Sequence, residues 1–370
     1  MRIAADGYEL GRGARGVGRV IQNFLRHLPG LLPEDDIFVY VREPAATGRL
    51  TGLSESVLPW TGGYLRWLNG PLRRALRRDR PDIFIAANYV LPLFSRGPTV
   101  LIDPDISVVA HPEWYPRKYA LSRRFLVGRS LAGASAVVVP SEFTRREIRE
   151  RFRIPDRKMS VIGYGVEDSF RRRPGGEVER WKAEKGLAGK RLVGFLGSIF
   201  RRRHVLKLVR AVGRLRAESP VLAVHLVGEN LGGLSRTECD EVRSLPWVRW
   251  DTTLGEADLP VYYSALDAFA YLSEYEGFGF PPLEALACGT PAVVLGRASL
   301  AEVFRDVAIT VESVDEDSVA RGLRSALADG STGTGRRPDP AALRERFSWP
   351  KAAAELAGLL SALKSGVGGS

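Results

Sequence analysis

The sequence predicts an α/β protein made of two doubly wound domains, each built around a parallel β-sheet. Short apolar runs alternate with segments of helical periodicity, which is the order expected of repeated βαβ units. One series of such units ends near residues 163–174, and a second complete series follows it. The chain has 370 residues, more than a single hydrophobic core usually serves. We therefore expect one domain over residues 1–165 and a second over residues 166–345.

The first series begins at the N-terminus. Its strands are short apolar runs, and its helices carry apolar residues three or four positions apart. Strands are expected near Arg2 to Ala5, Ile37 to Val41, Ile83 to Ala86, Thr99 to Ile102, Ala136 to Pro140 and Ser160 to Ile162. Helices are expected near Val17 to His27, Gly63 to Arg78, Tyr119 to Ala132 and Glu142 to Phe152.

The second series repeats the pattern after the charged run Arg171 to Pro174. Its strands are expected near Leu192 to Leu196, Leu222 to Val227, Trp247 to Trp250, Leu266 to Leu272, Ala292 to Leu295 and Ala308 to Val311. A polar stretch then precedes one last helix from about Pro340 to Leu363. We assign residues 346–370 to that helix and a flexible tail.

Composition narrows the classes of function. Lys and Arg number 54 and Asp and Glu 43, so the net charge is +11, but the charge is spread along the chain and no nucleic-acid motif accompanies it. Cys239 and Cys288 lie far apart and lack metal-ligand spacing. No apolar run approaches the ~20 residues that span a bilayer, and the N-terminus lacks a signal-peptide core. We expect a cytoplasmic protein that binds neither nucleic acid nor zinc.

The most informative motif is the run from Glu276 to Leu286, EGFGFPPLEAL. It follows an apolar strand and places two glutamates eight residues apart around a glycine-aromatic turn. The two prolines then open a short helix that ends at Gly289, because proline suits the first helical turn and glycine the position after the last. Free N–H groups at a helix N-terminus favour an anionic ligand. A sugar nucleotide, which carries a diphosphate between two sets of hydroxyls, fits this arrangement.

At this run the chain resembles the family-four retaining glycosyltransferases, whose signature is E-G-F-G-x-P-x-x-E. The resemblance implies the GT-B fold, in which two facing Rossmann-like domains enclose a cleft and a C-terminal helix crosses back to the first domain. It also implies that Glu276 lies by the donor sugar and that Glu284 accepts hydrogen bonds from the ribose. The family pattern further places the amides of the turn around the sugar, namely those of Gly277, Phe278, Gly279 and Phe280.

A second stretch, Gly197 to His204, follows the first strand of the second series and opens a helix. Backbone amides of Gly197 and Ser198 together with guanidinium groups suit a diphosphate, since arginine holds phosphate with two hydrogen bonds. The family that the chain resembles has a similar stretch, in which an arginine stands at the position of Arg202 and a lysine at the position of Arg203. We expect Arg202 and Arg203 to act on the diphosphate; the alternative is a surface cluster of arginines.

In the first domain, residues 11–16 spell the dinucleotide fingerprint G-x-G-x-x-G, but several residues separate it from the first strand. The string Gly16-Val17-Gly18-Arg19 instead resembles a glycine loop of family members that act on sugar acceptors. We therefore expect Gly16, Gly18 and Arg19 on the acceptor side of the cleft, with Asn88 as a further acceptor residue. A purely structural loop is the alternative.

The stretch Thr99 to Trp114 resembles a family segment that reads H-D-L-S-F and then P-E-W. Pro104 stands where relatives carry a histidine near the donor sugar. Asp105 is the catalytic candidate that remains there, although a carboxylate repels a diphosphate.

A basic stretch near residues 60–78 combines bulky apolar residues with arginines near helical spacing. One hypothesis is that the first domain docks on an anionic membrane and so reaches a lipid-linked acceptor from the inner face. The alternative is a domain helix that buries its apolar side while its arginines stay in water.

The resemblance implies transfer of a hexosyl unit from a nucleotide diphosphate sugar to a hydroxyl of a saccharide, lipid-linked or small-molecule acceptor, with retained configuration. Its nearest strings belong to mannosyl- and rhamnosyltransferases of polysaccharide assembly, so GDP-mannose is the first donor expected. No metal and no further cofactor are implied. Two alternatives stay open: an inactive sugar-nucleotide-binding protein of the same fold, because of Pro104, and an NAD-dependent oxidoreductase, because of the glycine fingerprint.

Overall fold

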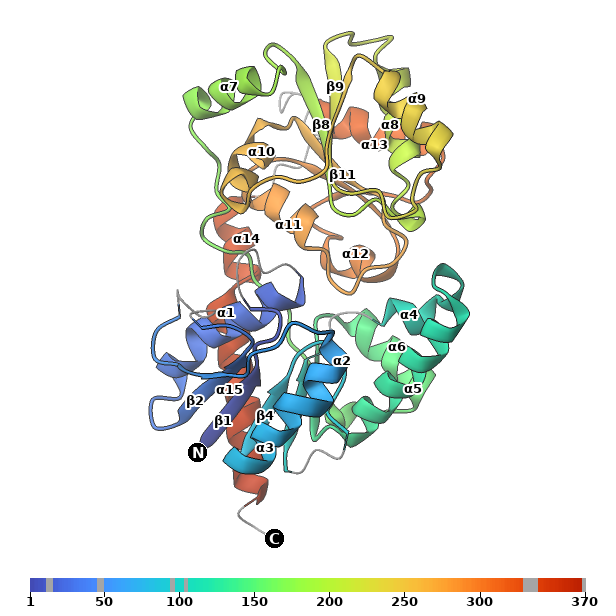
Figure 1. Cartoon of the computed structure of the whole chain (residues 1–370). Coiled ribbons are helices and arrows are strands. Elements are labelled where there is room, and N and C mark those ends of the chain that lie inside the picture. Colours follow the sequence, from blue (N-terminus) through green and yellow to red (C-terminus); the bar gives the residue numbers. More distant parts are fainter. Residues whose placement is uncertain (11–15, 45–49, 94–96, 103–105, 329–338, 368–370) are drawn as a thin grey trace. The chain divides into compact units, whose positions relative to one another are not determined.

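The computed structural model describes residues 1–10, 16–44, 50–93, 97–102, 106–328 and 339–367, without the side chains of 365–367. The chain divides into two compact units (Figure 1). One consists of Met1–Gly165 together with Ser348–Ser370, and the other of Val166–Phe347. Each unit is an α/β structure around its own parallel sheet, which confirms the predicted fold class.

The sheet of the first unit has the strand order β3-β2-β1-β4-β5-β6-β7, and all its strands run parallel. The six strands expected here are present, and the fully buried ones are continuous apolar runs, as parallel strands covered on both faces should be. The unpredicted β3 is a half-exposed edge strand of sequence SESV, without apolar alternation. The strands are β1 (Arg2–Asp6), β2 (Asp36–Val41), β3 (Ser54–Val57), β4 (Ile83–Ala86), β5 (Thr99–Ile102), β6 (Ala136–Val139) and β7 (Met159–Val161).

The helices of the first unit include all four expected ones. The helix expected over Gly63 to Arg78 is interrupted by a π-helical turn at Leu68–Leu72, which contains Pro71. Proline has no N–H to continue the helical hydrogen bonds, so the backbone widens there. The helical segments are α1 (Val17–Leu31), α2 (Tyr64–Trp67), η1 (Leu68–Leu72), α3 (Arg73–Asp79), α4 (Ser107–Ala110), η2 (Pro112–Trp114), α5 (Arg117–Gly133), α6 (Glu142–Phe152), η3 (Asp156–Lys158) and α15 (Trp349–Val367).

The apolar side of α2, η1 and α3 lies inside the unit. Trp67, Leu68 and Leu72 have no exposed surface and belong to the hydrophobic core. Because burial in the core already uses these side chains, they are not available to a membrane. The structure therefore supports the alternative of a domain helix for residues 60–78.

The C-terminal segment ends in two helices, so the prediction of a single helix over Pro340 to Leu363 is wrong. The first helix, α14 (Pro340–Arg346), ends at Phe347, whose φ of −105° and ψ of 75° leave the helical region. Proline at position 350 then lies in the first turn of α15, where its missing N–H costs nothing. As predicted, the second helix returns to the first unit, where α15 packs against α1.

Gly165 allows the chain to pass Trp349 closely inside the first unit. The Trp349 ring stacks on Tyr164 with centroids 5.6 Å apart and meets Phe24 edge-on at 5.5 Å. A Cβ on Gly165 would lie 2.7 Å from Cγ of Trp349 and 2.8 Å from the carbonyl carbon of Ser348. No L-residue fits these distances without movement of the backbone.

Gly165→Ala is accordingly expected to lower the free energy of unfolding by about 1–3 kcal/mol, the usual effect of overpacking. Urea unfolding of the variant, followed by tryptophan fluorescence, measures the change. Gly163→Ala is the matched control, because a Cβ there meets nothing within 4 Å. Equal stability of the two variants would contradict the packing argument.

The sheet of the second unit has the order β10-β9-β8-β11-β12-β13, again entirely parallel. All strands expected in the second series are confirmed. The chain builds this sheet outward from β8 in one direction and then from β11 in the other. Open α/β sheets bind ligands outside the carboxyl ends of the strands where this direction reverses. The strands are β8 (Arg191–Leu196), β9 (Leu222–Val227), β10 (Val248–Asp251), β11 (Ala268–Tyr271), β12 (Ala292–Leu295) and β13 (Ile309–Val311).

The helices of the second unit cover its sheet and carry most connections between strands. Those that matter for the site are α10 and α11, which contact one another, and the short turn η4 after β8. The helical segments are α7 (Gly175–Glu184), η4 (Arg201–Arg203), α8 (Val205–Leu215), α9 (Arg236–Ser244), η5 (Glu256–Asp258), α10 (Leu259–Ala265), α11 (Phe280–Ala287), α12 (Ala298–Val303), α13 (Glu316–Leu327) and α14.

Candidate functional site

The carboxyl ends of β8 and β11 bring together residues that are far apart in the sequence. The two strands are hydrogen-bonded neighbours, and the strand order reverses between them. Gly197 and η4 follow β8, and Glu276 follows β11. Because parallel strands end at the same edge of a sheet, the two predicted donor-binding segments meet there.

Glu276 is held by groups from both segments. Its Oε1 accepts a hydrogen bond from Nε of Arg203 at 3.0 Å and forms an ion pair with the same guanidinium, whose Nη2 lies 2.9 Å away. The hydroxyls of Tyr271 and Ser273 donate to the same oxygen at 3.0 and 2.8 Å. These contacts all reach Oε1, and the second carboxylate oxygen takes none of them.

The charges around Glu276 keep it ionised. Burial by itself raises the pKa of the carboxyl, but Arg203, Arg202 and the hydroxyls of Ser273 and Tyr271 together outweigh burial and hold the pKa below its ordinary value. A carboxylate with a lowered pKa is a poor proton acceptor at neutral pH. Glu276 is therefore suited to accept hydrogen bonds and to orient a cation, rather than to transfer a proton.

Arg203 has a fixed geometry. Besides its two contacts with Glu276, its Nη1 donates to the carbonyl oxygen of Ser198 at 2.9 Å, and the guanidinium carbon lies 5.2 Å from the centre of the Tyr271 ring. Gly197, with φ of 138°, makes room for it, since a Cβ there would lie 2.7 Å from Nη1. The sequence predicts that the amide of Gly197 binds phosphate, but this N–H donates to the carbonyl oxygen of Val227 at 2.9 Å. What Gly197 contributes here is the space that Arg203 occupies.

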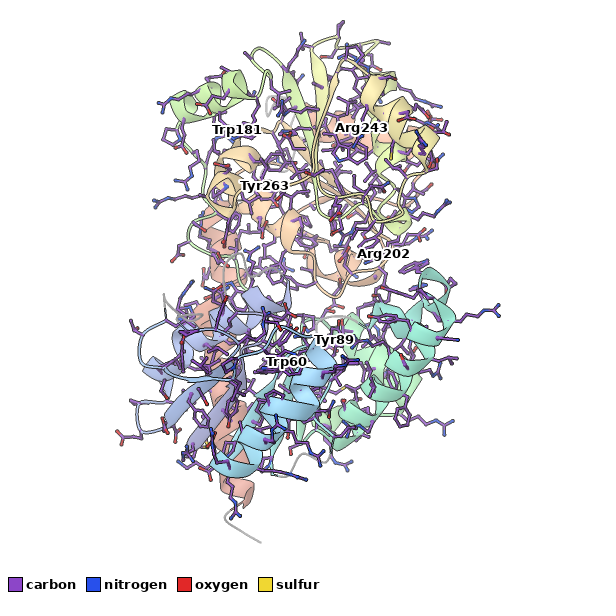
Figure 2. The ribbon with its side chains drawn as sticks, in the orientation of Figure 1. Trp60, Tyr89, Trp181, Arg202, Arg243 and Tyr263 are labelled. Atoms are coloured by element: carbon purple, nitrogen blue, oxygen red, sulfur yellow. The ribbon has the colours of Figure 1, made fainter. Side chains whose placement is uncertain are left out.

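Arg202 is almost fully buried, with 9% of its surface exposed, and its guanidinium lies over the ring of Phe200 at 4.5 Å. Figure 2 shows it in the second unit. The structure therefore excludes the alternative of a plain surface arginine for Arg202. Arg201, by contrast, is exposed.

The glycine-aromatic turn leads into α11 as predicted. Gly279 lies just before the helix with φ of 107°, and a Cβ there would lie 2.7 Å from Cδ2 of Leu300. The hydroxyl of Ser299 donates to the carbonyl oxygen of Glu276 at 2.6 Å, which fastens the start of the turn to α12. Phe278 and Phe280 pack together with centroids 5.4 Å apart, and Gly277 connects Glu276 to them.

Glu284 lies on α11 and is 2% exposed. Its Oε2 accepts a hydrogen bond from the hydroxyl of Tyr263 on α10 at 2.6 Å. The two signature glutamates therefore have different partners. Sequence reasoning missed Tyr263, Tyr271 and Ser273, because each lies in an apolar stretch that reads as core and nothing local marks its hydroxyl.

The residues predicted to contact the acceptor lie in the first unit. Gly16, with φ of 53°, caps α1, whereas Gly18 is buried and Arg19 partly buried inside its first turns. Asn88 follows β4, and its Nδ2 donates to Oε1 of Glu9 at 3.4 Å. Asn88 also has a positive φ of 62°. The structure thus places Asn88 at the carboxyl edge of the first sheet.

Two predictions lie outside the described residues, namely Asp105 with its neighbour Pro104, and the glycine fingerprint up to residue 15. Within the described ranges, no group of three or more His, Cys, Asp or Glu side chains could hold a metal ion. Nor does any helix in those ranges have the length and apolar character needed to cross a membrane.

Comparison with known proteins identifies the family of this chain. A sequence model described as "Glycosyl transferases group 1" matches residues 177–345, and one described as "Glycosyltransferase Family 4" matches residues 14–170. The chain is 31% identical to a D-inositol 3-phosphate glycosyltransferase of Actinosynnema mirum, over 85% of this chain and 80% of that protein. It is 28% identical to O-antigen chain mannosyltransferase B of Escherichia coli, over 74% of this chain and 73% of that one.

A solved structure shares the fold. HepE of Anabaena in complex with UDP-glucose matches 98% of this chain and 100% of its own with a TM-score of 0.76, at 18% identity. The two parallel-sheet units and the shared fold, taken together with the two family matches, identify a glycosyltransferase of the GT-B type. The chain belongs to glycosyltransferase family four. The predicted alternative of an NAD-dependent oxidoreductase has no support in these findings.

Proposed function

We propose that the protein is a retaining hexosyltransferase that moves mannose or a related hexose from a nucleotide diphosphate sugar to a hydroxyl. The acceptor in this proposal is a saccharide or a lipid-linked saccharide, and GDP-mannose is the first donor to test. The observation that carries the proposal is the Arg203–Glu276 pair at the carboxyl ends of β8 and β11.

Arg203 and Arg202 supply the charge that such a reaction needs. When the sugar leaves, negative charge grows on the diphosphate, and cations already fixed in place stabilise it without reorganisation. Arg203 is preorganised by Glu276 and Ser198, and Arg202 by the Phe200 ring. The backbone adds less than the sequence predicts, because the N–H of Gly197 donates to the carbonyl oxygen of Val227 at 2.9 Å, and Pro281 and Pro282 in the first turn of α11 have no N–H. In this proposal the two arginines therefore carry the stabilisation of the diphosphate.

Glu276 has two tasks in this proposal. Through Oε1 it orients Arg203, and through its second oxygen it accepts hydrogen bonds from hydroxyls of the donor sugar. Its lowered pKa makes it unsuited to take the acceptor proton. Glu284 accepts from the ribose hydroxyls, with Tyr263 fixing the carboxylate.

In the transfer step the bond between the anomeric carbon and the diphosphate oxygen breaks. The acceptor oxygen forms the new bond from the same face of the sugar, and the departing phosphate oxygen takes the acceptor proton. Atoms and charge balance without a covalent enzyme intermediate. The proposed order of steps needs only residues that bind the donor and the acceptor and orient them.

The relatives support the choice of donor and acceptor. The E. coli relative is a mannosyltransferase of an O-antigen chain, and the Anabaena neighbour holds UDP-glucose. The first name supports mannose as the transferred sugar and an O-antigen chain as the kind of acceptor, and the second supports a nucleotide sugar as the donor. The +11 charge of this chain is compatible with an anionic donor.

A thermal-shift panel of GDP, UDP, ADP and their hexose derivatives tests donor binding. We expect stabilisation by one nucleotide and its sugar above the rest, because binding to the folded state raises the melting temperature. Release of nucleotide from the stabilising donor, measured with candidate saccharide acceptors, then tests transfer. Binding without release would favour the inactive sugar-nucleotide-binding alternative, which Pro104 motivates. Stabilisation by none of the panel would overturn the proposal.

A further inference from the structure

The outward face of α5 carries an unusual combination of side chains. Leu121 and Phe125 are each 69% exposed. They are four residues apart on one helix and therefore lie side by side. A contiguous apolar patch rimmed by polar residues can mark a site of contact with a protein or a membrane.

Cations flank this apolar pair on the same exposed side. Arg117 lies one turn before Leu121, while Lys118 and Arg124 lie three residues before and after it, and all three are exposed. The opposite side of α5 is anchored, because Val127 and Leu131 are buried and Ala120 packs against Val108 and Val109 of α4. In Figure 1, α5 lies beside α4 and α6 within the first unit. We call Arg117, Lys118, Leu121, Arg124 and Phe125 the α5 surface.

We propose that the α5 surface docks on an anionic lipid membrane. Leu121 and Phe125 insert at the level of the headgroups, and the three cations pair with lipid phosphates around them. A second copy of the chain fits poorly, because it would bring the same positive charges face to face. The purpose of such docking rests on the proposed lipid-linked acceptor, but the contact itself does not.

Co-sedimentation with phosphatidylcholine vesicles, with and without phosphatidylglycerol, tests the contact. We expect binding only to the vesicles that contain phosphatidylglycerol, and weaker binding at high salt because salt screens surface charges. Replacing the three cations, as Arg117→Gln, Lys118→Gln and Arg124→Gln, is expected to weaken partitioning by about a hundredfold, since each contributes about tenfold or slightly less. Leu121→Ser with Phe125→Ser is expected to weaken it at least tenfold.

Matched controls separate this surface from general charge and general hydrophobicity. Arg74→Gln, Arg77→Gln and Arg78→Gln remove the same charge from exposed positions on α3. Val221→Ser with Leu231→Ser removes apolar side chains of 46% and 47% exposure from the second unit. Equal effects of controls and α5 variants, absence of binding to anionic vesicles, or an oligomer in sedimentation velocity that the α5 variants dissociate would each overturn the proposal. Because no donor or acceptor is needed, failure here leaves the proposed reaction untouched.

A second, independent observation concerns Asp6, the last residue of β1. It is 1% exposed, its Oδ1 accepts a hydrogen bond from the backbone N–H of Tyr8 at 3.0 Å, and its Oδ2 lies 2.7 Å from the Tyr64 hydroxyl. The same hydroxyl lies 3.1 Å from the carbonyl oxygen of Ala87. One hydroxyl hydrogen cannot serve both oxygens. Both contacts are satisfied when Asp6 carries a proton and donates it to Tyr64, which then donates to Ala87.

The turn that Ala87 begins is strained. Asn88 and Tyr89 have φ of 62° and 50°, although neither is glycine. Non-glycine residues in this region cost free energy and persist only where the surroundings hold them. The Tyr64 hydrogen bond to Ala87 is one such restraint, and β1 and β4 are adjacent strands.

We infer that Asp6 is a positioning residue whose proton, relayed through Tyr64, holds the turn at Asn88 and Tyr89 on the carboxyl edge of the first sheet. Burial is the main cause that raises the pKa of Asp6 from 3.8 to about 7. The hydrogen bonds from Tyr8 and Tyr64 lower the pKa in part, and the charge of Glu9 raises it slightly. A group whose pKa is raised by folding stabilises the fold at low pH, and this contribution disappears as the pH rises through about 7. The turn is therefore held below that pH and loosened above it. The ionisable groups that face this site are Glu9, Tyr8, Arg42, Tyr64 and Tyr89.

Hydrogen exchange of the peptides that cover residues 86–91 tests this inference. Exchange is measured at pH values one below and one above about 7 and is corrected for intrinsic exchange rates. The unaltered protein is expected to exchange several-fold more slowly at the lower pH. Asp6→Asn keeps a donor toward Tyr64 at every pH and is expected to protect the turn at both values. Tyr64→Phe removes the relay and is expected to exchange fast at both. A pH dependence that survives in Asp6→Asn, or none in the unaltered protein, would overturn the inference, whatever the outcome of the transferase assays.

Discussion

Arg203→Ala is expected to lower the rate of sugar transfer by about a hundred- to a thousandfold, the usual result of removing one preorganised group that stabilises developing charge. The alanine leaves the diphosphate without a fixed guanidinium and leaves Glu276 buried without its cation. Steady-state kinetics with the donor from the thermal-shift panel measures the loss, which should appear mainly in kcat.

Two variants make this result specific. Arg201→Ala removes a neighbouring arginine from the same turn η4, but one that is exposed, and should retain activity close to that of the parent. Arg203→Lys keeps the charge but cannot place two nitrogens against Glu276, so its rate should lie between those of Arg203→Ala and the parent. Parent-like activity of Arg203→Ala would remove the basis of the proposed function.

Substitutions of the two signature glutamates are expected to have different effects on turnover and on nucleotide binding. Glu276→Gln keeps the shape of the side chain but no longer holds Arg203 by charge, so we expect turnover to fall by about a hundredfold. Nucleotide affinity should stay equal or improve, because a carboxylate beside a diphosphate repels it. Glu284→Gln should instead weaken nucleotide binding by about tenfold, through the loss of charge-assisted hydrogen bonds to the ribose.

Isothermal titration with GDP and UDP, together with initial rates, separates these effects. Glu274→Gln is the control for charge, since Glu274 pairs with His204 beside the site rather than with Arg203. Tyr263→Phe removes the hydroxyl that contacts Glu284 and leaves the carboxylate, so it should weaken nucleotide binding less than Glu284→Gln does. If Glu276→Gln lost affinity and Glu284→Gln lost only turnover, the two assigned roles would have to be exchanged.

Much of the fold could be predicted because the relevant signals are local. Buried parallel strands are continuous apolar runs, so all but one of the strands were expected, and the exception, β3, is short, polar and half-exposed. Proline lies at both places where an expected helix is interrupted, namely Pro71 within the π turn and Pro350 at the start of α15. In each case the residue that breaks the helix was visible, but whether the chain would bend, widen or stop depended on packing.

The basic stretch over residues 60–78 shows the limit of periodicity. Its apolar residues and arginines alternate at helical spacing, which an interfacial helix and a domain helix share. Only the burial of Trp67, Leu68 and Leu72 in the core distinguishes the two. On α5 the sequence pattern does not mark a docking helix. Only the exposure of Leu121 and Phe125 in the structure carries the docking proposal.

By itself, the sequence determined the two series of parallel strands, the glycines where the chain must turn, and the glutamates and arginines available for chemistry. These properties depend on neighbouring residues, so a linear chain already contains them. Only the tertiary structure decided that Arg203 reaches Glu276, 73 residues away, that Tyr271 and Ser273 share its carboxylate, and that Tyr263 lies against Glu284. Such contacts depend on which strand ends meet at one edge of a sheet, and that is settled by the packing of the whole unit.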